Sequence, residues 1–168
     1  TERILEVVEK CEIQDQAIVN IQGDEPFLAI EIIKEVVSLL ENSSFEIVTA
    51  SEAIHEREIF ENSNAVKVVF DSTKKALYFS RSPIPCYRNG NYPSKNIAWK
   101  HLGIYGFKPM IFHQLSKLNQ TSLEEAEKLE QLRWLENGYT IQTLETEYET
   151  VGIDTPEDLV KIKKMGLV

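Results

Sequence analysis

Residues 17–27 read Ala-Ile-Val-Asn-Ile-Gln-Gly-Asp-Glu-Pro-Phe, and this stretch decides the fold. Residues 17–21 are short, apolar and partly β-branched, which predicts a buried strand. The apolar run then stops abruptly at a glycine and two carboxylates. In open α/β sheets, ligands bind outside the carboxyl ends of the strands. Asp24 is therefore a candidate ligand for a hard cation such as Mg²⁺, which prefers carboxylate oxygens.

The same loop has a second interpretation. Asp24 or Glu25 could cap a following helix, with Pro26 in the first turn of that helix. Spacing alone gives these two interpretations about equal weight, so the role of Asp24 stays open at this point.

A second group of acidic residues near the end of the chain raises the same choice. In the sequence Gly-Ile-Asp-Thr-Pro-Glu-Asp, Thr155 suits the N-cap position of a helix and Pro156 suits the first helical position. Asp154 then lies just outside the helix and is available to a metal. The alternative is that Asp154 is itself the cap.

The surrounding pattern predicts an α/β domain. We expect helices over residues 2–11, from about 30 to 41, and from 155 onward. A further helix is predicted from Ser122 to Asn137, with Glu125 completing a capping box. Strands are predicted over 17–21, 47–50, 66–70, 76–80, 99–107 and 141–144. Helices and strands alternate in the first third, which is typical of a parallel sheet, and the hairpin at 66–80 makes the sheet mixed.

Length and composition limit the possible functions. The 168 residues suit one domain, spanning residues 1–168. Because 27 acidic residues outnumber 18 basic ones, the net charge is −9, and the chain lacks the basic surface of a nucleic-acid binder. No apolar run approaches the ~18 residues that indicate a membrane span. The spacing of Cys11 and Cys86 does not suggest a zinc site.

Several polar residues are weaker candidates for a site. His101 and Tyr105 lie on one face of the predicted strand 99–107. Arg81 follows a strand, where its guanidinium suits a carboxylate or phosphate, although pattern alone favours a surface salt bridge. One face of the helix from Ser122 carries polar residues that could bind a polyhydroxylated ligand, although a solvated face is favoured by about three to one. These residues are Glu127, Glu130, Gln131 and Trp134.

Six motifs in order carry a family resemblance. They are IVNIQGDEPF, NAVKVVFD, ALYFSRSPIP, KHLGIYGF, SLEEAEKLEQLRWLENG and GIDTPEDL. Together they cover nearly the whole chain and resemble the 3-deoxy-manno-octulosonate (Kdo) cytidylyltransferases, the CMP-Kdo synthetases of lipopolysaccharide biosynthesis. HLGIYG and LEQLR are the specific motifs, whereas GDEP alone is weak.

The resemblance implies a fold and a reaction. The fold is the Rossmann-like nucleotide-diphospho-sugar transferase fold, with a mixed, mostly parallel sheet flanked by helices. The reaction is attack of the anomeric 2-hydroxyl of Kdo on the α-phosphate of CTP, giving CMP-Kdo and pyrophosphate. The family is implied to need Mg²⁺, to form homodimers and to act in the cytoplasm.

The resemblance also implies roles for residues at matching positions. Asp24 and Asp154 match the metal-binding, catalytic aspartates. Positions that hold the sugar acid are matched by Arg81, His101, Tyr105, Glu130 and Gln131. Gln22 matches a glutamine near the same substrate, and Arg3 matches a nucleotide-binding arginine at the rim of the active site.

One part of the family pattern has no counterpart in residues 1–168. The family's N-terminal strand, and the loop whose Arg and Lys hold the CTP phosphates, would precede Thr1. We therefore expect the fold to be incomplete at its N-terminus and the natural protein to be longer. Two alternatives follow: a cytidylyltransferase for sialic acid or an amino analogue of Kdo, and a non-catalytic, sugar-acid-binding fragment.

Overall fold

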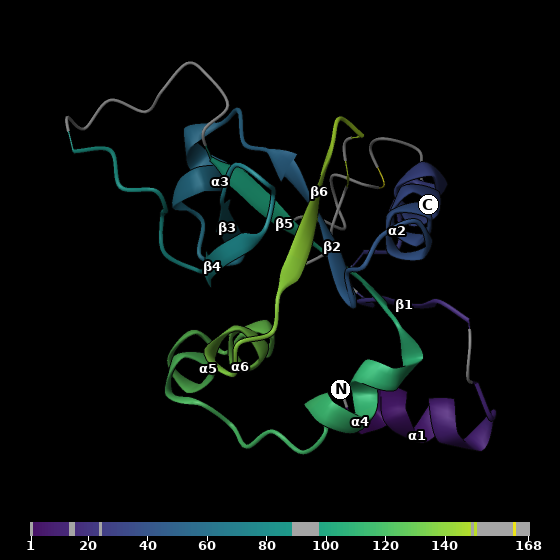
Figure 1. The fold of residues 1–168 in the computed structure, drawn as a ribbon. Coiled ribbons are helices and arrows are strands. Elements are labelled where there is room, and N and C mark those ends of the chain that lie inside the picture. The colour runs from purple at the N-terminus through teal and green to yellow at the C-terminus, as the bar shows by residue number, and fades with distance from the viewer. Residues whose placement is uncertain are drawn as a thin grey trace.

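In a computed structural model, the described residues are 2–13, 16–23, 25–88, 98–148, 150 and 163. They form one six-stranded sheet with helices on both faces (Figure 1). The helices are α1 (Glu2–Lys10), α2 (Ile30–Glu41), α3 (Arg57–Glu61), the 3-10 turn η1 (Pro109–Ile111), α4 (Phe112–Leu115), α5 (Ser122–Glu127) and α6 (Gln131–Glu136). The strands are β1 (Ile18–Ile21), β2 (Ile47–Ala53), β3 (Lys67–Phe70), β4 (Ala76–Ser80), β5 (Trp99–Phe107) and β6 (Ile141–Thr146).

The sheet is mixed, as the sequence predicts. Its order is β4-β3-β5-β2-β6, and β1 also pairs with β5. Strands β1, β2, β3 and β6 run in one direction, so most strands share a direction. The expectation of mostly parallel pairing is nevertheless wrong for the described strands, where β2–β6 is the only parallel pair. The reason is that β5 is inserted in the opposite direction between β2 on one side and β1 and β3 on the other.

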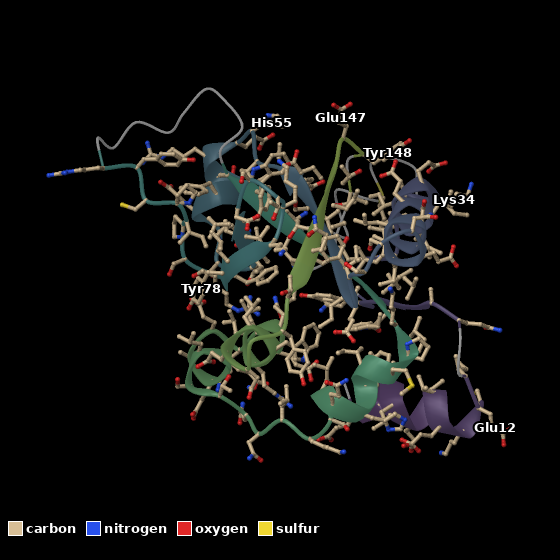
Figure 2. The ribbon with its side chains drawn as sticks, viewed as in Figure 1. Glu12, Lys34, His55, Tyr78, Glu147 and Tyr148 are labelled. Atoms are coloured by element: carbon tan, nitrogen blue, oxygen red, sulfur yellow. The ribbon has the colours of Figure 1, made fainter. Side chains whose placement is uncertain are left out.

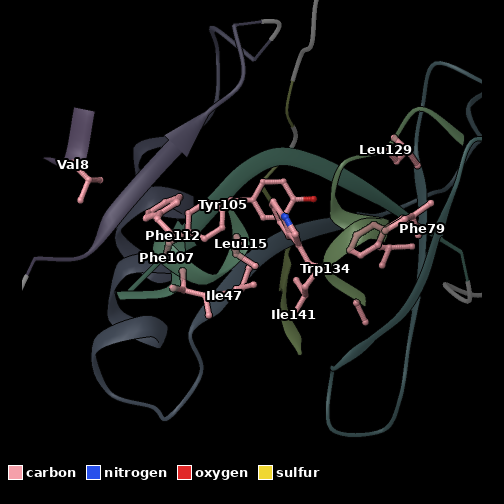
Figure 3. Packing of buried hydrophobic residues seen from close by; sticks show 14 residues of the cluster. Val8, Ile47, Phe79, Tyr105, Phe107, Phe112, Leu115, Leu129, Trp134 and Ile141 are labelled. Carbon is pink, nitrogen blue, oxygen red and sulfur yellow. The ribbon is translucent and has the colours of Figure 1, made fainter. Parts of the chain in front are cut away.

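The hydrophobic core has one layer on each face of the sheet. Side chains of a strand alternate between its faces, so Ile47 and Val48 enter different layers. Helix α2 covers one face through Ile32, Val36 and Leu40. The other face is covered by α1, α4, α5 and α6, which lie apart from α2 across the sheet in Figure 1. Phe107, Phe112 and Trp134 pack in this second layer, where Figure 3 shows them together.

The start of α2 bears on the two interpretations of the loop after β1. Helix α2 begins at Ile30, its N-cap is Ala29, and no side chain caps it. The capping interpretation of Asp24 and Glu25 is therefore wrong, since the helix starts several residues later. Asp24 itself lies outside the described residues, so its metal-binding role stays a prediction.

Two other predictions concern helices. The predicted helix from Ser122 to Asn137 is in fact two helices, because Lys128 adopts a left-handed conformation (φ 55°, ψ 44°). The predicted C-terminal helix and Asp154 lie outside the described residues. Within those residues, no helix is both long and apolar enough to cross a membrane. The prediction of a single domain over 1–168 stays a prediction.

Candidate functional site

A cavity of about 300 Å³ opens where two strands meet end to end along one edge of β5. Strand β1 pairs with the second half of β5, and its last contact is the Gln22 N–H donating to the Gly103 carbonyl at 2.8 Å. Strand β3 pairs with the first half, beginning where the His101 N–H donates to the Val66 carbonyl at 2.8 Å. The carboxyl end of β1 therefore lies at the cavity, as the sequence predicts for the residue 22–26 loop.

The cavity brings together residues that the sequence places far apart. Its lining includes six of the predicted site residues: Gln22, Arg81, His101, Tyr105, Glu130 and Gln131. Arg3 is exposed on α1 and is not among the lining residues, although its neighbour Ile4 is. Asp24 and Asp154 lie outside the described residues. Their position relative to the cavity therefore stays a prediction.

His101 is held in one tautomer by its neighbours. The register of β2 on β5 shifts between Thr49 and Ala50, and the Thr49 hydroxyl donates to the Ile104 carbonyl at 2.7 Å. A hydroxyl has a single proton, so the 3.0 Å contact between Thr49 Oγ1 and His101 Nε2 requires Nε2 to be the donor. Burial, with a smaller effect from Lys100, lowers the pKa of His101 to about 3. The ring is therefore neutral at pH 7, with Nδ1 left as an acceptor.

Tyr105 and Trp134 add two buried polar atoms. Their rings meet edge to face with centroids 5.3 Å apart, and Figure 3 shows them side by side. Within the described residues, the Trp134 indole N–H makes no hydrogen bond, and the Tyr105 hydroxyl lies near the Thr49 side chain without a well-formed one. Burial, together with the Glu130 carboxylate, raises the pKa of Tyr105 well above its usual value, so the phenol stays protonated. Both residues line the cavity, so two buried hydrogen-bond donors lie in its wall.

Gly103 makes room for the polar wall beside His101. A Cβ at this position would lie 2.7 Å from Gln22 Oε1 and 3.0 Å from Glu25 Cγ. The Gly103 N–H donates to Glu25 Oε1 at 3.3 Å. A glycine between His101 and Tyr105 thus lets the loop after β1 approach β5 closely.

Arg81 is held by main-chain oxygens from two segments. Its Nε donates to the Glu127 carbonyl at 2.9 Å, and its Nη1 donates to the Ser63 carbonyl at 3.2 Å. Among the described residues, no carboxylate lies within salt-bridge distance of Arg81, so the expected surface salt bridge is absent there. A guanidinium that is oriented by neutral carbonyls keeps its charge available for an anionic ligand.

The break at Lys128 sets the positions of Glu130 and Gln131. Because α5 ends there, Glu127 does not share a face with Glu130 and Gln131, and the prediction of one continuous polar face is wrong. Helix α6 begins at Gln131, which is buried and lines the cavity. The two helices are joined by Arg133, whose Nε and Nη2 donate to the two Glu124 oxygens at 2.7 and 2.5 Å. This guanidinium lowers the pKa of Glu124, and it lies 3.9 Å from the Glu130 carboxylate.

Comparison with known proteins identifies the family. A family model described as Cytidylyltransferase matches residues 1–164. The 3-deoxy-manno-octulosonate cytidylyltransferase of Thermodesulfovibrio yellowstonii is 44% identical over 173 residues, covering 98% of this chain and 68% of that protein. The chain belongs to the 3-deoxy-manno-octulosonate cytidylyltransferase family.

Other relatives of this chain agree. The Fusobacterium nucleatum protein of the same name is 45% identical over 166 residues, covering 96% of this chain and 65% of the relative. A solved CMP:2-keto-3-deoxy-manno-octonic acid synthetase complexed with CTP superposes with a TM-score of 0.86 at 33% identity, covering 99% of this chain and 67% of that one. The chain spans about two thirds of the length of these relatives. The predicted family and the nucleotide-sugar transferase fold are confirmed.

The predicted Mg²⁺ site stays a prediction for this chain. Within the described residues, no three His, Cys, Asp or Glu side chains are grouped so as to hold an ion. Both predicted metal ligands lie outside them. Gln22 and Glu25, which flank position 24 in the chain, line the cavity.

Sequence reasoning missed several residues that shape the site. Thr49 lies in a buried strand, where a threonine carries no distinctive signal. Gly103 did carry one, because a glycine inside a strand pattern often marks a close approach of another segment. Lys67 is fully buried, and it lies among valines in the strand pattern Val-Lys-Val-Val. Because a lysine is rarely buried without partners, its presence in this apolar strand was the available signal. The remaining histidines do not line the cavity. His55 lies by Glu147 and Tyr148 (Figure 2), and His113 is exposed.

Proposed function

We propose that the protein carrying this chain is a cytidylyltransferase that activates Kdo with CTP, giving CMP-Kdo and pyrophosphate for lipopolysaccharide biosynthesis. One observation carries the proposal: the five residues that match sugar-acid positions of the family line one cavity together with Gln22, which matches a glutamine near the same substrate. Family membership and the likeness to a synthetase complexed with CTP support it further.

The chemistry of the cavity suits a sugar acid. In this proposal Arg81 pairs with the carboxylate of Kdo, because its guanidinium is oriented by carbonyls and unneutralised by the described carboxylates. His101 Nδ1 accepts a hydrogen bond from one sugar hydroxyl. The Tyr105 hydroxyl and the Gln131 amide donate to other oxygens, and Glu130 accepts from hydroxyls. Catalysis is then largely a matter of positioning the 2-hydroxyl against the α-phosphate.

The proposal includes Mg²⁺, held by Asp24 and Asp154. Two carboxylates are a donor set that suits this hard cation, which keeps its other positions for phosphate and water. When bound, the ion would offset the charge that develops on the triphosphate as pyrophosphate leaves. Arg3 is proposed to contact the nucleotide. Homodimer formation and action in the cytoplasm are further proposals that rest on the family resemblance.

The test is pyrophosphate release by the full-length gene product with CTP, Mg²⁺ and a panel of sugar acids. The proposal predicts release with Kdo and much less with sialic acid or the amino analogue of Kdo. Preference for another acid would identify a related cytidylyltransferase instead. Absence of release with every acid, together with Kdo binding but no CTP binding in calorimetry, would instead support a non-catalytic sugar-acid binder.

A further inference from the structure

Lys67 is a fully buried lysine at the start of β3, and it follows directly on Val66, which lines the cavity. Its ammonium donates to three main-chain carbonyls: Asn62 at 2.7 Å, Ala65 at 2.5 Å and Arg81 at 2.7 Å. An ammonium has three N–H donors, so each is used once. The lysine thereby ties the segment before β3, whose residues 64–66 line the cavity, to the segment after β4.

Glu127 makes a second set of contacts, with the end of β4 and with Arg81. Its carboxylate accepts from the Ser80 hydroxyl at 2.6 Å and from the Arg81 N–H at 2.9 Å. The Tyr78 hydroxyl donates to it at 3.4 Å, and Figure 2 shows Tyr78 where β4 approaches α5. A carboxylate that accepts several hydrogen bonds from one strand end fixes that end firmly against the helix.

Both polar groups of the Arg81 main chain are therefore held by charged side chains. The N–H donates to Glu127, and the carbonyl accepts from Lys67. The Arg81 guanidinium is oriented by the carbonyl of Glu127 itself and by the carbonyl of Ser63, which lies in the segment that Lys67 holds. We propose that Lys67 and Glu127 are positioning residues, a Lys67–Glu127 clamp that holds Arg81 in place to bind the carboxylate of the sugar acid.

This inference rests on the proposed function, because it takes Arg81 as the group that binds the substrate's carboxylate. It assigns Lys67 and Glu127 no contact with substrate. A clamp of this kind acts on the affinity for one substrate only: the sugar acid would bind more weakly without it, whereas CTP would not.

The charges around Lys67 make the clamp sensitive to pH. Burial lowers the pKa of Lys67 to about 8, opposed by the Glu127 carboxylate and reinforced by the Arg81 guanidinium. Tyr78 is the other titratable group at Glu127, and burial raises its pKa. The clamp is complete at pH 7, where Lys67 is protonated. As the pH rises through 8, the neutral amine keeps two donors for three carbonyls, so one hydrogen bond is lost.

The experiment measures KM for Kdo and for CTP from pH 7 to 9.5 in the full-length wild type, Lys67→Met and Glu127→Gln. Lys108→Met is the matched control, because Lys108 donates to the Ser43 carbonyl at 2.8 Å without contacting Arg81. At pH 7 we expect the Kdo KM of Lys67→Met to rise about tenfold, the change associated with losing a charge-assisted hydrogen bond. Glu127→Gln should shift it in the same direction, and the CTP KM should stay constant in every variant.

The wild type alone provides a second measurement if Lys67→Met does not fold. Its Kdo KM should rise between pH 8 and 9.5 while its CTP KM does not. A Kdo KM that is flat across this range, or equal changes in both KM values, would overturn the clamp and leave Lys67 with a purely structural role. Failure of the wild type to use any sugar acid would overturn the proposed function and the clamp together.

Discussion

The neutral, buried His101 predicts a loss of stability in mild acid. Its pKa is about 3 in the folded protein because of burial, against about 6.5 in an unfolded chain. The unfolded state therefore binds the proton first, and stability falls as the pH drops below 6.5. Lowering the pH from 7 to 5 therefore lowers the free energy of unfolding by about 2 kcal/mol.

The assay is urea unfolding of wild type and His101→Gln at pH 7, 6 and 5. For an m-value of about 2 kcal/mol/M, the wild-type midpoint should fall by about 1 M more than the variant's midpoint over this range. His55 and His113 are exposed and present in both proteins, so their effect cancels in the comparison. Parallel midpoints in the two proteins would refute the account of a histidine held neutral by burial.

Three further predictions concern residues around the cavity. Thr49→Val should destabilise the protein by about 2–4 kcal/mol, because the Ile104 carbonyl and the His101 N–H both lose a buried partner, while Thr49→Ser should retain most of the stability in a thermal melt. Gly103→Ala should lower the free energy of unfolding by about 1–3 kcal/mol and weaken Kdo binding in calorimetry, because the added Cβ would lie 2.7 Å from Gln22 Oε1. Gly23→Ala is the steric control, because a Cβ there would have nothing within 4 Å. Arg133→Met should cost about 3 kcal/mol in urea unfolding, because it leaves the buried Glu124 carboxylate unpaired.

Much of the fold follows from local sequence patterns. The strand over residues 17–21 and the helix that follows were predicted because apolar residues recur at the spacing of each element. The alternation of residues 99–107 correctly placed His101 and Tyr105 on one face, where their ring centroids lie 5.2 Å apart. Such periodicity is a property of each segment alone, so no long-range contact is needed to read it.

Pairing between strands was harder to predict. Local patterns give no direct information on which strand lies beside which. The position of β5, with β2 on one side and both β1 and β3 on the other, was therefore not predicted. This insertion creates the cavity, because β1 and β3 leave part of the same β5 edge between them.

The break in the helix from Ser122 was missed for a related reason. Lys128 carries no local signal for a left-handed conformation, which ordinarily favours glycine or asparagine. It is stabilised here by tertiary contacts, among them Glu127 with the end of β4 and Glu124 with Arg133. Periodicity alone favoured a solvated face for Glu130 and Gln131, whereas the family resemblance named them as site residues, and both line the cavity.

The central claim is that the cavity between β1, β3 and α6 binds the sugar acid. The most direct test is an NMR titration of the full-length protein carrying ¹⁵N-labelled histidine with Kdo, with the His101 signals assigned from His101→Gln. Of the three histidines in residues 1–168, only His101 lines the cavity, so His55 and His113 are internal controls. The account predicts a saturable shift of the His101 Nδ1 resonance, with His55 and His113 unchanged. Saturable Kdo binding that leaves His101 unchanged would place the sugar acid elsewhere and contradict the account.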